Sequence, residues 1–178
     1  MTLTVKRPET RVLFCLDGDL KAEHEAAETE YTAARSRSVV DARLNDPTKD
    51  LAQKVIDLED QMKASSVTFL IRGLPRGEWS GMKTAHTPRT DNTTDKAYGF
   101  NVETLMVEAL PKSIVSVENA AGEVLPFDAS KEWDALADDM TDSQYEDFVL
   151  AVLRVNAGRN DVPFSLSAFR MIQDFEQK

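Results

Sequence analysis

The chain has 178 residues and carries 21 Lys and Arg against 31 Asp and Glu, a net charge of −10 near neutral pH. This length suits about one ordinary domain with its own core, and the acidic balance excludes nucleic acid as the principal partner, because phosphate binding needs a basic surplus. No apolar run approaches the ~18 residues of a membrane span, and the N-terminus lacks the apolar stretch of a signal peptide. We therefore expect no membrane partner and a cytoplasmic location.

The first predicted element is a strand over residues 11–16. Arg-Val-Leu-Phe-Cys-Leu is rich in β-formers, and Asp17-Gly18-Asp19 closes it with a turn. Cys15, the one cysteine of the chain, lies in this run. We expect it to be a small buried hydrophobe rather than a nucleophile.

A long antiparallel helical hairpin follows this strand. Residues 20–44 contain neither Gly nor Pro, and Asn45-Asp46-Pro47 ends that helix and starts the next, with Asp46 as N-cap. The second helix carries one apolar stripe at steps of four, three and four residues: Leu51, Val55, Leu58 and Met62. A second strand at 67–72 returns to the base of the hairpin, where it can pair with the first.

The second half of the chain is predicted to be helical. A short helix covers 78–85, residues 86–99 form a polar loop, and further helices begin at Asn101, Ser130 and Thr141, the last with a capping box. A final helix near 165–176 presents Phe169 and Phe175. The expected fold class is α+β, predominantly helical, with a strand-helix-helix-strand module at 1–74 and an acidic helical module at 75–178.

The charge is unevenly distributed between these halves. Residues 1–89 hold 14 basic and 14 acidic side chains, whereas residues 90–178 hold 7 basic and 17 acidic ones. Ten acids lie within 117–150, among them Asp134, Asp138 and Asp142. Such a run is either a solvated face or a docking surface for a basic partner.

The familiar catalytic motifs are missing from the sequence. There is no GxxxxGK[ST] or GxGxxG loop for phosphates, and Ser80 stands one place late for a GxSxG nucleophile elbow. Two histidines and one cysteine do not make a Cys/His zinc site. We therefore expect a protein that is not an enzyme and that has no catalytic, cofactor or metal site.

From residue 66 onward, the order of several short motifs is distinctive. A strand ending in Arg72 precedes Glu78-Trp79 and His86-Thr87-Pro88-Arg89, and Gly99-Phe100-Asn101-Val102-Glu103-Thr104 comes next. Trp133-Asp134-Ala135-Leu136, a capped helix ending at Asn156 and Asp161-Val162-Pro163-Phe164-Ser165 complete the series. Over residues 66–168 this order resembles the tail assembly chaperones of actinobacterial siphophages and prophages.

The resemblance implies a cytoplasmic assembly factor that coats the tape-measure protein, keeps it soluble and helps recruit tail-tube subunits, without entering the mature virion. Candidate partner-binding residues are those of the hairpin stripe, the acidic run and the last helix: Leu51, Val55, Leu58, Met62, Asp134, Asp138, Asp142, Phe169 and Phe175. Core packing is the competing interpretation of the apolar ones. A homo-oligomer is a further expectation. The alternative functions are a structural virion component, such as a minor tail or head–tail connector protein, and a general helical-hairpin interaction module.

Overall fold

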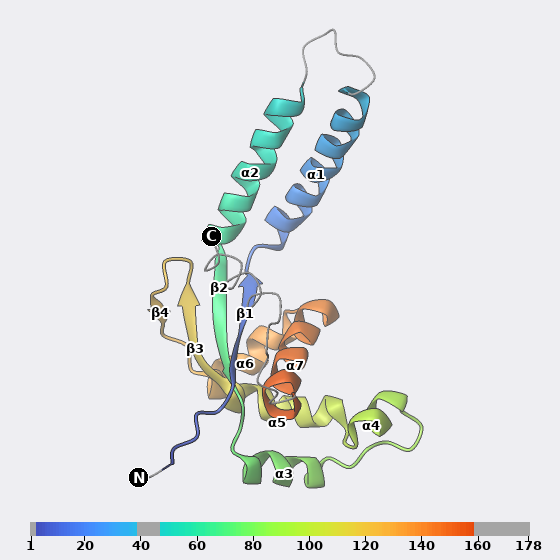
Figure 1. The fold of residues 1–178 in the computed structure, drawn as a ribbon, viewed down its shortest axis with the longest axis vertical. Coiled ribbons are helices and arrows are strands. Elements are labelled where there is room, and N and C mark those ends of the chain that lie inside the picture. The colour runs from blue at the N-terminus through green and yellow to red at the C-terminus, as the bar shows by residue number, and fades with distance from the viewer. Residues whose placement is uncertain (1–2, 39–46, 159–178) are drawn as a thin grey trace, which may run out of the picture.

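The computed structural model describes residues 3–38 and 47–158, which have the predicted fold class, a predominantly helical α+β fold (Figure 1). The helices are α1 (Gly18–Ser38), α2 (Thr48–Ala64), α3 (Arg76–Ala85), α4 (Thr93–Tyr98), α5 (Val102–Ser113), α6 (Ala129–Asp138) and α7 (Asp142–Ala157). The strands are β1 (Glu9–Cys15), β2 (Ser66–Arg72), β3 (Ile114–Asn119) and β4 (Val124–Leu125). The proposed N-cap Asp46 and the predicted helix at 165–176 lie outside the described residues.

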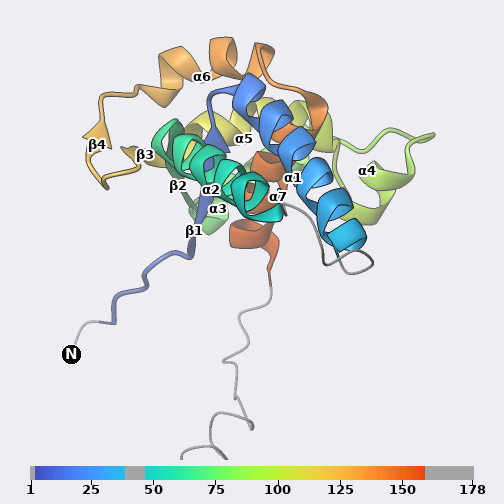
Figure 2. The same ribbon diagram turned by 90° about the horizontal axis from the view of Figure 1, so that it is seen from above.

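The helical hairpin and the strand pair at its base are confirmed. α1 and α2 lie side by side and project away from the other helices (Figures 1 and 2). β1 and β2 pair antiparallel, with Glu9 opposite Arg72 and Cys15 opposite Ser66. The apolar β-formers of the two strands thus meet as the sequence predicts.

The sheet has two strands more than the sequence analysis predicted. Its order is β1-β2-β3-β4, all neighbours antiparallel, with a register shift in β2 between Leu70 and Ile71. β3 follows α5 directly, and α5 contains Pro111 near its end. Since no turn residues separate that helix from the strand, the local sequence does not mark the change.

One face of the sheet carries the core. Phe69 of β2 is 1% exposed and makes edge-to-face contacts with Phe148 of α7, at 5.1 Å between ring centroids, and with Trp133 of α6, at 6.3 Å. Trp133 and Phe148 lie 4.9 Å apart. Each such aromatic pair contributes about 0.5–1.5 kcal/mol beyond the area that it buries. The core thus joins strands from the first half of the chain to helices from the second.

The opposite face of the sheet is open. Side chains alternate between faces along a strand, so Val12 is buried toward the helices while its neighbour Leu13 is 69% exposed. On β4, Val124 is exposed in the same way. No helix of the described residues covers this face (Figures 1 and 2).

The predicted polar loop at 86–99 is in part helical, which corrects the sequence analysis. α4 lies within it, with the Asn92 side chain accepting a hydrogen bond from the Asp95 backbone N–H as its N-cap. Gly99 ends this helix with φ +78°, a left-handed conformation that favours glycine. The loop is therefore built by its own caps.

Candidate functional site

The apolar stripe of the hairpin lies on α2, which packs along α1. Leu58 is buried, at 5% exposure, and Leu51, Val55 and Met62 are half-buried. Packing against α1 therefore buries much of the apolar surface of the stripe but leaves part of it exposed. Partner binding by these four residues stays a prediction.

A pocket of about 410 Å³ lies at the base of the hairpin, and we call it the basal pocket. β1, the start of α1, the end of α2 and α7 all line it. Its apolar lining includes Leu13, Phe14 and Met62, and its charged lining includes Lys21, His24, Glu59, Lys63 and Asp147. Of the stripe residues, Met62 is therefore the one that this concavity offers to a partner.

The two chemically reactive side chains of the basal pocket are not arranged for catalysis. The Cys15 thiol donates to the Asp17 carbonyl at 3.4 Å and lies 3.5 Å from the Ser65 hydroxyl. Neither group is a base that would generate a thiolate. The buried Nε2 of His24 has no hydrogen-bond partner in the described part of the chain, and the Glu59 carboxylate lies 3.7 Å away. The pocket is suited to binding an apolar group rather than to nucleophilic chemistry.

The predicted acidic residues lie on the surface of α6 and at the start of α7. Asp134, Asp138 and Asp142 are exposed. They belong to an acidic segment at 134–147 whose six carboxylates form no ion pair with any described residue: Asp134, Asp138, Asp139, Asp142, Glu146 and Asp147. Because Asp147 also lines the basal pocket, the acidic segment reaches its rim.

Phe169 and Phe175, the remaining predicted partner-binding residues, lie outside the described residues. The structure brings Met62 together with Asp147, the one residue of the acidic segment that lines the basal pocket; the predicted Asp134, Asp138 and Asp142 do not line it. The structure keeps Leu51 and Val55 on the hairpin, on the turns of α2 that come before Leu58 and the basal pocket.

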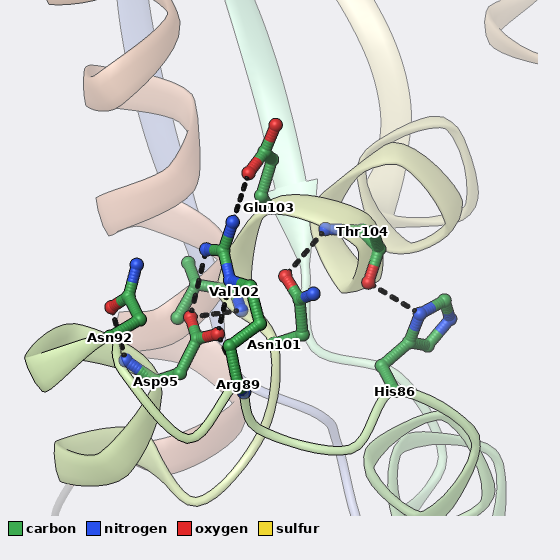
Figure 3. Close-up of polar contacts among 8 residues, drawn as sticks. All are labelled: His86, Arg89, Asn92, Asp95, Asn101, Val102, Glu103 and Thr104. Atoms are coloured by element: carbon green, nitrogen blue, oxygen red, sulfur yellow. Dashed lines mark hydrogen bonds and ion pairs between the residues drawn. The ribbon is translucent and has the colours of Figure 1, made fainter.

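A polar network that the sequence analysis missed joins the 86–99 segment to α5 (Figure 3). The Asp95 carboxylate is fully buried and accepts from Arg89 Nε at 2.7 Å and Nη2 at 3.2 Å. Backbone N–H groups of Arg89 and Val102 donate to the same carboxylate. The Arg89 guanidinium lowers the pKa of Asp95 to about 2, and Asp95 in turn raises the pKa of Arg89.

The network continues along α5. Arg89 also donates to Glu103 at 2.7 Å, and the His86 ring makes a hydrogen bond with Thr104; Figure 3 draws both. The other ring nitrogen of His86 makes a hydrogen bond with Glu108. The hydrogen bond from Lys112, and to a smaller extent that with His86, lowers the pKa of Glu108. Every carboxylate here is held by a cation, so the arrangement fixes a loop rather than supplying a free acid or base. An Asn three residues before an Asp, as in Asn92 and Asp95, is the one local signal that could have located it.

Within residues 3–38 and 47–158, no group of three or more His, Cys, Asp or Glu side chains is placed to hold a metal ion. None of the described helices is both long enough and apolar enough to cross a membrane.

No protein-family model, curated protein or solved structure matches this chain.

Proposed function

We propose that this chain is a tail assembly chaperone of a siphophage or prophage, acting in the host cytoplasm and absent from the mature virion. In this proposal it has no enzymatic activity, binds the tape-measure protein, keeps it soluble and helps to recruit tail-tube subunits. The motif order over residues 66–168 suggests this role.

The observation that carries the proposal is the basal pocket with the acidic segment at its rim. A long helical client presents apolar side chains at helical spacing, and a groove-binding protein takes such side chains in an apolar concavity. Leu13, Phe14 and Met62 supply apolar lining of this kind. The pocket lining itself carries both signs, but Asp147 and the unpaired carboxylates of the acidic segment beyond it favour a client whose flanking residues are basic.

Co-expression with the tape-measure protein of the same phage tests the proposal. We expect the soluble fraction of the client to rise at least about fivefold with this chain, since covering its apolar surface prevents aggregation. A client that is equally insoluble with and without the chain would contradict the proposed function. So would finding the chain in purified particles at fixed stoichiometry, as a minor tail or connector protein requires.

A matched pair of variants on α2 tests the place of binding. Met62→Lys puts a charge into the basal pocket, whereas Ile56→Lys puts the same charge on the same helix, at a residue that is 49% exposed and does not line the pocket. We expect Met62→Lys to weaken client binding at least about tenfold, the cost of one lost apolar anchor. Equal binding by the two variants would show that the client does not use the pocket.

A further inference from the structure

At β1 the sheet ends in a strand that has no hydrogen-bonded neighbour on its outer side among the described residues, although α7 packs against it. β1 is the outermost strand, and β2 is its neighbour. Gly73 N–H donates to the Pro8 carbonyl and Leu16 N–H donates to the Ser65 carbonyl, which fixes the phase of the ladder. Even-numbered residues therefore turn their backbone groups toward β2, and odd-numbered residues turn theirs outward.

The outward groups belong to Glu9, Arg11, Leu13 and Cys15. None of their backbone N–H or C=O groups has a hydrogen-bond partner among the described residues. Pro8 does not protect this edge, because its missing N–H lies at an inward position. A strand edge of this length is a template for another strand.

The charges along the edge are complementary to a second copy of the same strand. Within the chain, Glu9 pairs with Arg72 at 2.6 Å and Arg11 lies 4.0 Å from Glu118, so a second copy would add a further opposite charge beside each of these pairs. In an antiparallel pair centred on Thr10, Glu9 lies opposite Arg11 of the second copy, and the symmetric pair repeats this contact. If the register is shifted by two residues in one direction, Arg11 of one copy lies opposite Arg11 of the other. If it is shifted by two residues in the other direction, Glu9 lies opposite Glu9 of the other copy. Like charges directly opposite each other are destabilising, so the pairing centred on Thr10 is favoured over both of these shifted pairings.

The same register gives a place to the arm that precedes β1. Residues 3–6 run away from the rest of the described chain (Figures 1 and 2), and Leu3 and Val5 are each 88% exposed. In the pairing centred on Thr10, Val5 lies opposite Cys15 of the second copy and diagonal to its Leu13. Two exposed apolar positions, Val5 and Leu13, thereby cover each other.

We infer that β1 is a homodimerisation strand, which joins two copies edge to edge about a two-fold axis at Thr10 into one eight-stranded sheet. The pairing is isologous, so it closes at two copies. It uses the sheet edge and the arm, and so goes beyond the proposed function, with which it shares one residue, Leu13 of the basal pocket lining.

Oxidative cross-linking of full-length Val5→Cys tests the register. The introduced thiol would lie opposite Cys15 of the second copy, at a distance within disulfide reach. Residues 5 and 15 of one chain are ten positions apart on an extended segment, about 33 Å, and cannot form an intramolecular bond. We expect a covalent dimer whose disulfide joins positions 5 and 15 by peptide mapping. In wild type the two Cys15 side chains of the dimer would also lie about 33 Å apart. Wild type should therefore give no disulfide-linked dimer.

Val124→Cys is the control, because it adds an equally accessible thiol, at 68% exposure, on the strand at the other edge of the sheet. We expect its dimer yield to be at least about fivefold lower, since its position has no thiol partner in disulfide reach. Equal yields from the two variants, or a disulfide joining two Cys15 side chains, would overturn the register.

A charge exchange tests the pairing without cysteine chemistry. Arg11→Glu and Glu9→Arg should each weaken dimerisation at least about tenfold in sedimentation equilibrium. The double exchange restores opposite charges between the copies but not the intrachain pairs of Glu9 with Arg72 and of Arg11 with Glu118, so it should bind at least about threefold more tightly than either single variant. A wild-type chain that remains monomeric up to about 100 μM, or a double variant as weak as the single ones, would overturn the proposal.

Discussion

At the scale of single residues, Asp95 shows how a polar segment is ordered without a core. Its buried carboxylate replaces water with hydrogen bonds from one guanidinium and two backbone N–H groups. A buried carboxylate is stable as an anion only when it is paired in this way. The segment at 86–99 is long for a loop, and the Asp95 network fixes its position against α5.

The pH dependence of stability should report on this carboxylate. Because the pKa of Asp95 is lowered from 3.8 to about 2 in the folded chain, its contribution is fully present above about pH 5 and is lost as the pH falls through about 2. Asp95→Asn should therefore lower the denaturant midpoint at pH 7, with a difference from wild type that shrinks toward pH 2. Urea titrations at several pH values measure this. Asp91→Asn, at an exposed site in the same segment, is the control, and an equal effect would contradict the role of Asp95.

Two glycines should respond to alanine in opposite directions. A Cβ at Gly73 would lie 2.7 Å from the Val155 carbonyl oxygen in the backbone of α7, so Gly73→Ala should cost about 1–3 kcal/mol. A Cβ at Gly81, inside α3, meets nothing within 4 Å, and Gly81→Ala should stabilise by about 0.5–1 kcal/mol. Denaturant unfolding measures both. Opposite signs are required, and two destabilising changes would mean that α3 does not have the space assigned to it.

At the scale of elements, α7 connects the two halves of the chain. Thr141 and Gln144 form the capping box at its start, and Phe148 packs against Phe69 of β2 and Trp133 of α6. At its end, the Asn156 side chain accepts from Leu74 N–H at 2.7 Å. The middle and the end of the helix are thereby attached to β2 and to the residues that follow it, which are far away in the sequence.

Truncation of the α7 anchor should cost about as much as a typical aromatic core deletion. Phe148→Ala removes a fully buried ring and should lower the free energy of unfolding by about 3–5 kcal/mol. Leu150→Ala on the same helix, at 48% exposure, should change it by about 0.5 kcal/mol or less. Chemical denaturation of both variants measures the difference. Similar values would place Phe148 outside the core.

The elements that sequence reasoning found are those with strong local signals. The stripe of α2, the capping box at Thr141 and the β-formers of β1 and β2 are visible in short windows. β3 has no such punctuation, because its strand state comes from pairing with β2 and not from its own ends. The Asp95 network was missed for a related reason: its contacts to Arg89 and Val102 span six and seven residues and exist only after the chain has turned.

The candidate site was only partly predictable for the same reason. Met62 and the acidic residues stand out in the sequence, by periodicity and by charge. That Asp147 and Met62 line the same pocket depends on where α7 packs, which no local pattern specifies. Leu58 belongs to the same stripe as Met62, yet it is buried.

At the scale of the whole molecule, charge and shape are separated. The hairpin projects from one end of the sheet, and the unpaired carboxylates lie on α6 and α7 (Figure 1). A surface of one sign accelerates encounter with an oppositely charged partner more than it tightens the final complex. The acidic segment should therefore act on the association rate.

Charge reversal of the acidic segment tests this on the proposed client. Asp134→Lys/Asp138→Lys/Asp142→Lys should lower the association rate with the tape-measure protein at least about tenfold at low salt, and the difference should shrink at about 0.5 M salt. Stopped-flow or surface-based kinetics measure it. Two single variants, Asp91→Lys and Asp138→Lys, control for net charge, because they change it equally and only the second lies in the acidic segment. A reversal that leaves the rate unchanged at low salt would dispose of the docking interpretation.

The hydrogen bond between Leu16 and Ser65, 3.2 Å long, has a consequence for the way the chain is assembled. It brings the two ends of the hairpin to the spacing of neighbouring strands, so the hairpin is an insertion between the paired strands β1 and β2. Replacing residues 17–64 with an Asn-Gly turn should leave the β1–β2 register intact. We expect the shortened chain to retain the near-ultraviolet circular dichroism of the Trp133 core. Loss of that signal would mean that the hairpin is required for folding and is not a separable appendage.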